Sequence, residues 1–535
     1  MEFCGSHLGL VLAIALAPIL LLALSRRLRG TRLETPPGPP PLPILGNVFD
    51  IPKSFSALEY RQLSEKYGAP VVDLVSNIVK THVVWNAKTG DVVHLNAVGQ
   101  SMIVLGSLEA ATELLEKRSA KYSGKPTSVM AKLCGFDWTM ALLGTESESW
   151  RRQRRETHRF ISPTTVSRYY QLLENQAYTM LKKIMDDPAC YSEHIHHTLG
   201  LIISQATYGI DDDEHLGLLE EGHEIFIKAF VPGKYLAESL PFLQYVPDWF
   251  PGAQFKRDAK TWKARFNAIK REPFDAAMKA MNQGGVGDLS IAAAMIEGQD
   301  PSAVSPEDKE LAEMVCSAVY LGGAETTLTT LRVFILLMAT HPQAQARAQA
   351  ELDAVVGPDR LPSVSDRGAL PYVDAVLKEC LRWHPILPLA LLRTATAEDE
   401  YRGWRIPKGA IVMANSWAFA RDPTLFPNPD QFSPERFLDA DGRPDKNALD
   451  PRTFTFGYGR RVCPGRHFAE ATLFAVMASL LHVFNLAPPV DGDGRPVPLE
   501  PKFTPDLLSS PEPFGCQITV RSDAAKALVV AAGQV

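Results

Sequence analysis

One cysteine of this chain stands in a glycine-rich segment that leads directly into an apolar stretch. The segment reads Phe456-Gly457-Tyr458-Gly459-Arg460-Arg461-Val462-Cys463-Pro464-Gly465, and a helix is predicted to begin near His467. Backbone N–H groups and the N-terminus of a helix stabilise a thiolate. The pattern therefore predicts that Cys463 is a soft, anionic metal ligand.

The residues around Cys463 suit a flat cofactor that carries carboxylates on its rim. Gly459 and Gly465 have no side chain, so such a cofactor approaches the backbone at no steric cost. Arg461 supplies a cationic donor for the carboxylates, and Phe456 is placed to shield the sulfur from water. A cysteine taken alone is more often an ordinary buried residue. It is the surroundings of Cys463 that favour a ligand.

Five residues of this segment carry a resemblance to a known family. With Phe456, Gly459, Arg461, Cys463 and Gly465 all present, it resembles the haem-binding loop of the cytochrome P450 superfamily. The resemblance implies haem b as cofactor, with Cys463 as the axial ligand of its iron, and in this family the thiolate promotes O–O cleavage. It also implies the cytochrome P450 fold, which is mainly α with a small β-sheet region.

A second group of residues that could do chemistry lies inside the apolar segment 306–340, which is predicted to form one long helix. Two glycines stand in the middle of this helix, in the segment Gly322-Gly323-Ala324-Glu325-Thr326-Thr327. Each glycine destabilises a helix by about 1 kcal/mol relative to alanine. Close approach of a cofactor, or a local break in the helix, would explain them. An acid followed by a hydroxyl can deliver the protons that O–O cleavage consumes.

This segment resembles the oxygen-activation motif of the same family. The resemblance implies that Thr326 is the hydroxyl beside the iron and that Glu325 is the proton-relay acid. The alternative is a helix with a loosely packed Gly-Gly contact and a threonine that bonds back to its own helix. The cysteine segment favours the first interpretation.

Two separated segments predict a charge network. Glu379 and Arg382 lie three residues apart on a predicted helix, which sets the carboxylate and the guanidinium on one face. Alone this is weak evidence, because such pairs are common on solvated helices. Pro434-Glu435-Arg436-Phe437 matches the second arginine element of the family. The resemblance implies that Glu379, Arg382 and Arg436 form a buried network that is structural and not catalytic.

The strongest basic cluster is Trp150-Arg151-Arg152-Gln153-Arg154-Arg155. Trp150 and Arg154 are i,i+4 neighbours and so share one face of a predicted helix. The resemblance assigns both to a haem propionate, and Arg393 is a third propionate candidate. The remaining arginines face either an acidic electron-donor protein or only solvent.

Composition excludes a general attraction to nucleic acid. The 535 residues carry a net charge of -6, with 46% hydrophobic and 22% charged residues, as in ordinary globular proteins. No linker divides the middle of the chain, so one large haem-thiolate catalytic domain is expected over residues 51–535. The seven cysteines are odd in number and scattered, which predicts free thiols in a reducing compartment.

The N-terminus predicts a membrane anchor. Residues 8–24 carry no charge, and four arginines follow between positions 26 and 32. Such a run is a signal-peptide core or a short transmembrane helix, and the lack of a clear cleavage site favours a helix that stays. We expect a membrane anchor at 1–25, then a basic and proline-rich linker at 26–50. The positive-inside rule places the catalytic domain in the cytosol, and the resemblance implies a single-pass protein of the endoplasmic reticulum membrane.

Residues 69–89 are an atypical insertion. Family members are expected to run almost directly from the segment near Tyr67 into a first strand near Val92. The extra residues are either a surface loop or the product of a gene model that kept an intron. We assign them no function.

Periodicity predicts a mainly helical domain. Residues 56–355 have apolar side chains at three- and four-residue spacing. The strand candidates are few and short: Val92–Leu95, Met102–Leu105, Arg405–Ile406 and Ile411–Ala414.

The segments that the resemblance places around the substrate are largely apolar. They include Phe230, Phe242, Ile386, Leu387 and Leu389. A mainly apolar small-molecule substrate is therefore expected, although for any one of these residues core packing is the better explanation.

The resemblance as a whole implies a monooxygenase of fungal secondary metabolism. Such an enzyme takes electrons from an NADPH-cytochrome P450 reductase and inserts one atom of O2 into a terpenoid, a polyketide or a similar molecule. One alternative is an isomerase or dehydratase with the same fold, whose members typically lack the acid and threonine that Glu325 and Thr326 supply here. Another is a haem-binding homologue without catalysis.

Overall fold

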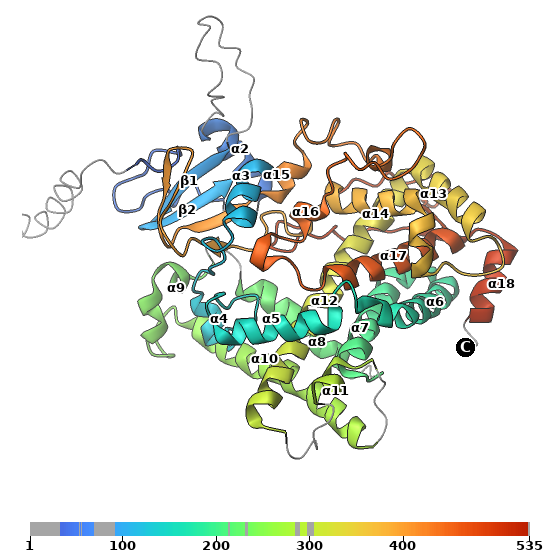
Figure 1. Ribbon diagram of the computed structural model, residues 1–535, viewed down its shortest axis with the longest axis horizontal. Coiled ribbons are helices and arrows are strands. Elements are labelled where there is room, and N and C mark those ends of the chain that lie inside the picture. The colour runs from blue at the N-terminus through green and yellow to red at the C-terminus, as the bar shows by residue number, and fades with distance from the viewer. Residues whose placement is uncertain are drawn as a thin grey trace, which may run out of the picture.

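The described part of the chain is mainly helical, with short strands beside the helices, in this computed structural model (Figure 1). The structure describes residues 33–52, 54, 56–68, 91–211, 215–230, 234–283, 289–296 and 304–532. The predicted anchor at 1–25 and the predicted insertion at 69–89 lie outside the described residues. The mainly α class predicted from the sequence is confirmed.

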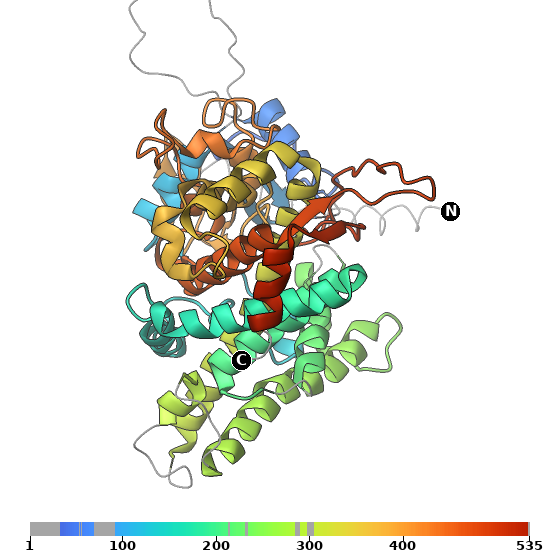
Figure 2. The ribbon, with the colours of Figure 1, turned by 90° about the vertical axis from the view of Figure 1, so that its right-hand side faces the viewer.

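The helices follow one another with few strands between them. Their bounds are α2 Ala57–Tyr67, α3 Leu108–Ala111, α4 Val129–Leu133, α5 Glu148–Ile161, α6 Tyr170–Asp186, α7 Tyr191–Tyr208, α8 Leu216–Ala229, α9 Leu236–Ser239, α10 Gln254–Asn282 and α11 Ile291–Ile296. The second half contains α12 Pro306–Thr340, α13 Pro342–Val355, α14 Pro371–Trp383, α15 Ser416–Ala420, α16 Arg452–Thr455, α17 Arg466–Val483 and α18 Asp523–Ala532. Figure 2 shows α18, in red, against α6, with which it is in contact.

The strands form one four-stranded sheet and two two-stranded sheets among the described residues. Their bounds are β1 Val92–Ala97, β2 Gln100–Leu105, β3 Arg393–Thr394, β4 Asp399–Tyr401, β5 Trp404–Ile406, β6 Ile411–Ala414, β7 Phe484–Ala487 and β8 Gln517–Val520. The larger sheet has the order β1-β2-β6-β3, and its β2–β6 pair is parallel. The four strand candidates from the sequence all lie in strands of this structure.

Helix α12 is the central element of the helical part. The hydroxyl of Ser305 accepts a hydrogen bond from the Asp308 backbone N–H, Pro306 occupies the first turn, and the helix ends before His341. It runs unbroken through Gly322 and Gly323, so the local break considered from the sequence does not occur. The helix packs on α5, α7, α8, α10 and α17.

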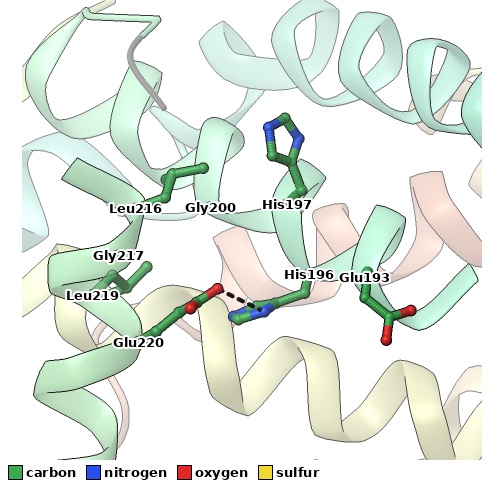
Figure 3. A pocket seen from close by; sticks show the side chains of 8 residues that line it. All are labelled: Glu193, His196, His197, Gly200, Leu216, Gly217, Leu219 and Glu220. Carbon is green, nitrogen blue, oxygen red and sulfur yellow. Dashed lines mark ion pairs between the residues drawn. The ribbon is translucent and has the colours of Figure 1, made fainter. Parts of the chain in front are cut away.

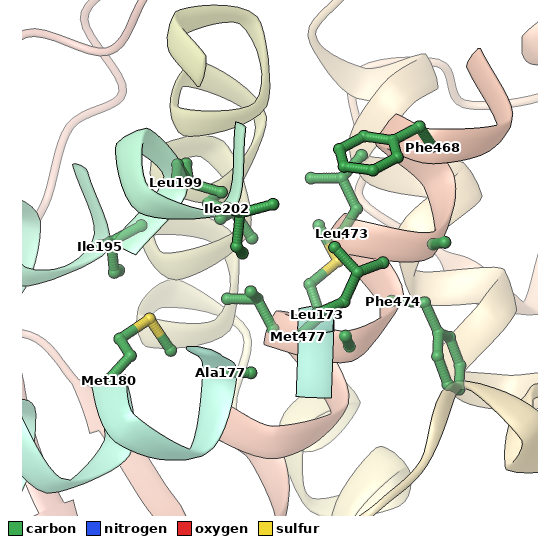
Figure 4. Close-up of a cluster of buried hydrophobic side chains, with 14 of the residues drawn as sticks. Leu173, Ala177, Met180, Ile195, Leu199, Ile202, Phe468, Leu473, Phe474 and Met477 are labelled. Atoms are coloured by element: carbon green, nitrogen blue, oxygen red, sulfur yellow. The ribbon is translucent and has the colours of Figure 1, made fainter. Parts of the chain in front are cut away.

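The main core lies between α6, α7, α12 and α17. Figure 4 shows apolar side chains of three of these helices pointing toward one another. The buried residues labelled there are Leu173, Ala177, Met180, Ile195, Leu199, Ile202, Phe468, Leu473, Phe474 and Met477. This core fixes α12 relative to α17, the helix that follows Cys463.

The proline-rich segment of the predicted linker lies against the sheet where it is described. The carbonyl of Pro37 accepts a hydrogen bond from the backbone N–H of His94 in β1, at 2.9 Å. The Asn47 side chain donates to the Pro39 carbonyl, also at 2.9 Å.

Helix α12 is the one helix of the described chain that is long and apolar enough to cross a membrane. Most of it is buried inside the protein, as expected of a core helix.

Candidate active site

The loop around Cys463 is held by its own backbone. The Cys463 N–H donates to the Phe456 carbonyl at 2.7 Å, and Gly457 has a φ of 80°, which favours glycine. A short 3-10 turn at Gly459–Arg461 follows, and α17 begins at Arg466. The loop thus places the Cys463 thiol at the N-terminus of α17.

Burial raises the pKa of the Cys463 thiol, while a hydrogen bond from the Gly465 backbone and the charges of Arg154 and Arg466 lower it. The groups that oppose the effect of burial are those that stabilise a thiolate. A metal ion at the sulfur would add to the same effect.

The two glycines beside Cys463 have different roles. A Cβ on Gly465 would meet only Ile161 Cδ1, at 3.9 Å, so this side of the loop is open. A Cβ on Gly459 would lie 2.6 Å from Ser119 Cβ and 2.8 Å from the Leu115 carbonyl oxygen. Gly459 therefore makes room for the segment that contains Leu115, and its predicted contact with a cofactor stays a prediction.

Arg461 lies beside Trp150, as the predicted cofactor-binding role of both requires. Its guanidinium stands over the indole ring at 5.0 Å from the centroid. It also donates to backbone carbonyls, those of Ser123 at 2.8 Å and Met140 at 2.9 Å among them. Burial lowers the pKa of Arg461 to about 10.

Arg393 and Arg154 lie near Arg461, and the structure adds Lys125. Arg393 donates to the Tyr458 carbonyl at 2.8 Å, and burial lowers its pKa to about 10. Lys125 Nζ donates to the Leu392 carbonyl at 2.9 Å; burial and the charges of Arg461 and Arg393 hold its pKa well below the ordinary value. Burial also lowers the pKa of Arg154, which is close enough to Cys463 to feel its charge.

Within the described residues, none of these four cations forms an ion pair with a carboxylate. Buried cations are usually paired, because burying an isolated charge is costly. The arrangement therefore fits a ligand that brings two carboxylates, and haem b has two propionates. The thiol of Cys463 beside Arg154, and the open space at Gly465, fit the same group.

Lys125 was not found from the sequence. Its position before Pro126 is the only local signal, and one sequence gives that signal no meaning. It becomes recognisable only because Arg393 and Arg461 lie next to it.

Thr326 and Glu325 are adjacent on α12, but their side chains contact different residues. The Thr326 hydroxyl donates to the Gly322 carbonyl at 3.0 Å, and a Cβ on Gly322 would meet nothing within 4 Å. The helix face that carries Gly322 and Thr326 is therefore partly open. A Cβ on Gly323 would lie 2.4 Å from Ile203 Cδ1, so this glycine permits close packing on α7.

The Glu325 carboxylate pairs with histidines of α7 and α8. Oε1 lies 2.6 Å from His196 Nε2, and Oε2 lies 3.9 Å from His223 Nε2. Burial by itself raises the pKa of Glu325, but the hydrogen bond from His196 and the charge of His223 outweigh it, so the pKa lies below its ordinary value. Sequence reasoning missed both histidines.

Glu379, Arg382 and Arg436 come together across two elements. Arg382 is fully buried and donates to both oxygens of Glu379, at 2.7 and 2.8 Å. Arg436 Nε donates to Glu379 Oε1 at 3.0 Å from the turn Pro434–Phe437. Arg382 also donates to the carbonyls of Ala420 and Pro429, so its guanidinium ties α14 to the chain that follows α15.

The remaining arginines of the basic cluster divide into two groups. Arg152 Nη2 lies 3.3 Å from Asp308 Oδ1, which ties α5 to the start of α12. Arg151 and Arg155 are exposed.

The apolar residues expected around the substrate lie in different surroundings. Phe242 is 62% exposed, so the expectation that it faces a substrate is wrong. Leu389 is buried beneath the four-stranded sheet. Phe230, which is partly buried, joins an apolar cluster with Phe226 and Leu321, and Leu321 precedes Gly322 on α12.

Comparison with known proteins gives one consistent result. The family model of cytochrome P450 matches residues 69–517. Cytochrome P450 monooxygenase COX1 of Coprinopsis cinerea is 37% identical over 94% of this chain and 95% of its own length. Tryptamine 4-monooxygenase of Psilocybe cyanescens is 36% identical over 96% of this chain and 98% of its own. Cytochrome P450 monooxygenase ppsD of Aspergillus oryzae is 35% identical over 93% of this chain and 91% of its own length.

Proposed function

The chain belongs to the cytochrome P450 family and is a monooxygenase, and we propose that it oxidises a mainly apolar small molecule of fungal secondary metabolism with haem b as cofactor. When bound, the haem activates O2, so that one oxygen atom enters the substrate and the other leaves as water. The residues of this chain hold that group, exclude water from it and supply protons.

The observation that carries this proposal is the cation group beside Cys463. Cys463 holds the iron as a thiolate, and Phe456 and Gly465 form the loop around it. Arg154, Arg393 and Arg461 bind the propionates, with Lys125 as a further donor and Trp150 stacked on Arg461. Arg393 is buried and the other three cations are partly buried, so a dianionic ligand would offset the cost of removing their charges from water.

Thr326 and Glu325 are proposed to handle protons. The Thr326 hydroxyl lies on the partly open face of α12, where it would donate a hydrogen bond or a proton toward the site of the haem. Glu325, one residue before it, holds a carboxylate that can pass protons toward that face after a side-chain rotation.

The substrate is proposed to be apolar because Leu321, the residue before Gly322 on α12, packs against a cluster of apolar side chains. Phe136, Phe226 and Phe230 belong to this cluster, with Phe136 stacked on Phe266 at 4.5 Å between ring centroids. One relative is named for the oxidation of tryptamine, so an aromatic amine is within the range of substrates that the family accepts. A terpenoid or polyketide suits the aromatic lining equally well.

Electrons are proposed to come from an NADPH-cytochrome P450 reductase. Arg151 and Arg155 are exposed on α5, whose Arg154 faces Cys463. Exposed cations close to the haem suit an acidic electron-donor protein, because opposite charges steer the encounter.

The protein is proposed to act on the endoplasmic reticulum membrane, with its catalytic domain in the cytosol. Besides the expected anchor, large apolar side chains are exposed in the segment after α9: Phe242 62%, Tyr245 78% and Trp249 79%. Residue Ile44, in the described part of the linker, is 80% exposed. Helix α9 and the segment 33–52 lie on the same left-hand side of Figure 1. Exposed aromatic groups of this kind suit a membrane interface.

The central test is the spectrum of the reduced protein with carbon monoxide. The wild-type chain is expected to show the long-wavelength Soret band of thiolate-ligated haem. Cys463→Ser removes that band, because a hydroxyl replaces the thiolate. Cys190→Ser is the matched control. This variant keeps the band, since Cys190 is a free cysteine in the short 3-10 turn directly before α7 and outside the Cys463 loop. A wild-type Soret band elsewhere refutes the proposed function.

A further inference from the structure

His196 stands between two carboxylates from different helices. Its Nε2 lies 2.6 Å from Glu325 Oε1 on α12, and its Nδ1 lies 3.3 Å from Glu220 Oε1 on α8. Both ring nitrogens thus face an acceptor, and the imidazole connects a nearly buried carboxylate with an exposed one. The side chain of Glu325 is 12% exposed and that of Glu220 is 58% exposed.

The outer side of His196 opens into a surface pocket of about 370 Å³ (Figure 3). The pocket is lined by residues of α7 and α8: Glu193, His196, His197, Gly200, Leu216, Gly217, Leu219 and Glu220. Figure 3 shows His196 directed toward Glu220, while His197 points away from both. His196 is therefore the residue that reaches from the pocket to α12.

The charges around His196 favour its protonated form. The hydrogen bond with Glu325 raises the pKa of His196 above its ordinary value of 6.5, against the opposing effect of burial. Glu325 and Arg332 face it from α12, and Glu220 faces it from α8. His223 of α8 also faces Glu325, but burial lowers its pKa, so His196 is the better cation of the two.

Taking the proposed function as its basis, we propose that His196 supplies protons to Glu325 and takes them from solvent in the pocket beside Glu220. His196 is a positioning and proton-supply residue, because it acts through Glu325 and not on the substrate.

The transfer balances within the chain and solvent. The imidazolium gives the proton on Nε2 to Oε1 of Glu325, so that one N–H bond breaks and one O–H bond forms. The ring is then neutral and keeps its proton on Nδ1. Rotation of the ring turns Nε2 toward the pocket, where it takes a proton from water. Glu220 stabilises the imidazolium that results.

The first test measures protonation without catalysis. Full-length protein labelled with ¹⁵N-histidine is titrated by NMR, and the His196 resonance is assigned from a His196→Gln spectrum. We expect a pKa above 6.5 that falls in Glu325→Gln, because the hydrogen bond with Glu325 is its largest cause. A His196 that titrates at or below 6.5, or that is unchanged in Glu325→Gln, overturns the proposal.

The second test measures turnover with the reductase and NADPH, without added substrate. His196→Gln is expected to slow NADPH oxidation by about 10²-fold, the lower end of what a positioned proton donor contributes. The matched control is His197→Gln, which alters a neighbouring histidine whose Nδ1 lies 3.2 Å from Lys183 Nζ. The control keeps the wild-type rate.

The pH profile separates proton supply from structure. Because the pKa of His196 is raised, the imidazolium persists below that pKa and is lost as the pH rises through it. Wild-type NADPH oxidation is expected to fall over that range, and the fall is absent in His196→Gln. Equal rates and profiles in His196→Gln and His197→Gln overturn the proposal.

These outcomes are independent of the test of the proposed function. If the thiolate spectrum is absent from the wild type, the monooxygenase assignment fails while the NMR titration still reports the His196 pairing. If the spectrum is present and the titration fails, only the proton-supply role is wrong.

Discussion

Two neighbouring threonines of α12 differ in what their hydroxyls can reach. Thr326 and Thr327 each donate to the carbonyl four residues before them, at 3.0 and 2.8 Å. Thr327 is buried, at 4% exposure, and follows Gly323 onto the face packed against α7. Thr326 lies on the partly open face with Gly322. Of the two hydroxyls, only that of Thr326 lies on the partly open face, in line with the role proposed for it.

This difference predicts the effect of removing either hydroxyl. In Thr326→Ala, product formation from an apolar compound that the wild type oxidises is expected to fall by about 10²-fold, while NADPH consumption continues and releases peroxide. Thr327→Ala is the matched control and keeps the ratio of product to NADPH, because its hydroxyl serves only its own helix. The ratio is measured by chromatography and NADPH absorbance. Equal ratios in Thr326→Ala and the wild type would remove Thr326 from the mechanism.

At the scale of elements, α12 combines a closely packed face with an open one. Gly323 lets α7 approach, since Ile203 occupies the space that a side chain would take. Gly322 faces open space, where a side chain would meet no atom. The two glycines, although adjacent in the sequence, therefore differ in what the absence of a side chain permits: close packing at Gly323 and open space at Gly322.

Replacing each glycine by alanine separates these two effects. Gly322→Ala is expected to raise stability by up to about 1 kcal/mol, the gain in helix propensity. Gly323→Ala gains the same propensity but overpacks against Ile203, which costs about 1–3 kcal/mol and makes the variant the less stable of the two. Thermal unfolding of the haem-loaded full chain, followed by circular dichroism, gives the order. A Gly323→Ala protein as stable as Gly322→Ala would contradict the packing argument.

A buried charge network joins elements that are distant in the sequence. Glu379 accepts hydrogen bonds from Arg382 and Arg436, and Arg382 also donates to backbone carbonyls of the segment 420–431. A buried ion pair is weak evidence for net stability, since desolvation opposes the attraction. Its hydrogen bonds join α14 to the segment 420–431, and the structural role that the family resemblance implies for it stays a prediction.

At the scale of the whole molecule, the proposed membrane contact has two parts with different strengths. A chain that lacks residues 2–25 is expected to leave the membrane on alkaline carbonate washing, whereas the full chain stays, because a spanning helix binds far more strongly than surface aromatics. Replacing Tyr245 and Trp249 by serine in the shortened chain further weakens its binding to vesicles at neutral pH, since both are exposed. Sedimentation of the membranes after carbonate washing measures the first effect, and sedimentation with vesicles measures the second. Full-chain release by carbonate would exclude the anchor.

The sequence by itself determined the elements and the chemistry of their residues. The helix 306–340, the strands near Val92, Met102, Arg405 and Ile411, and the start of the helix after Cys463 were predicted correctly in type and position. Periodicity, capping residues and turn residues are local, so a single sequence carries them. The same local signals predicted Glu379 and Arg382 on one helix face.

Only the tertiary structure decided which residues meet. Lys125 joins Arg393 and Arg461, Gly459 packs on Ser119, and Phe242 lies on the surface. Glu325 meets His196 because α7 and α8 pack on α12, and no spacing along the chain records how helices are packed. A helix periodicity defines a face but does not name the partner of that face. Contacts between distant segments depend on how the whole core packs, and the core assembles only in three dimensions.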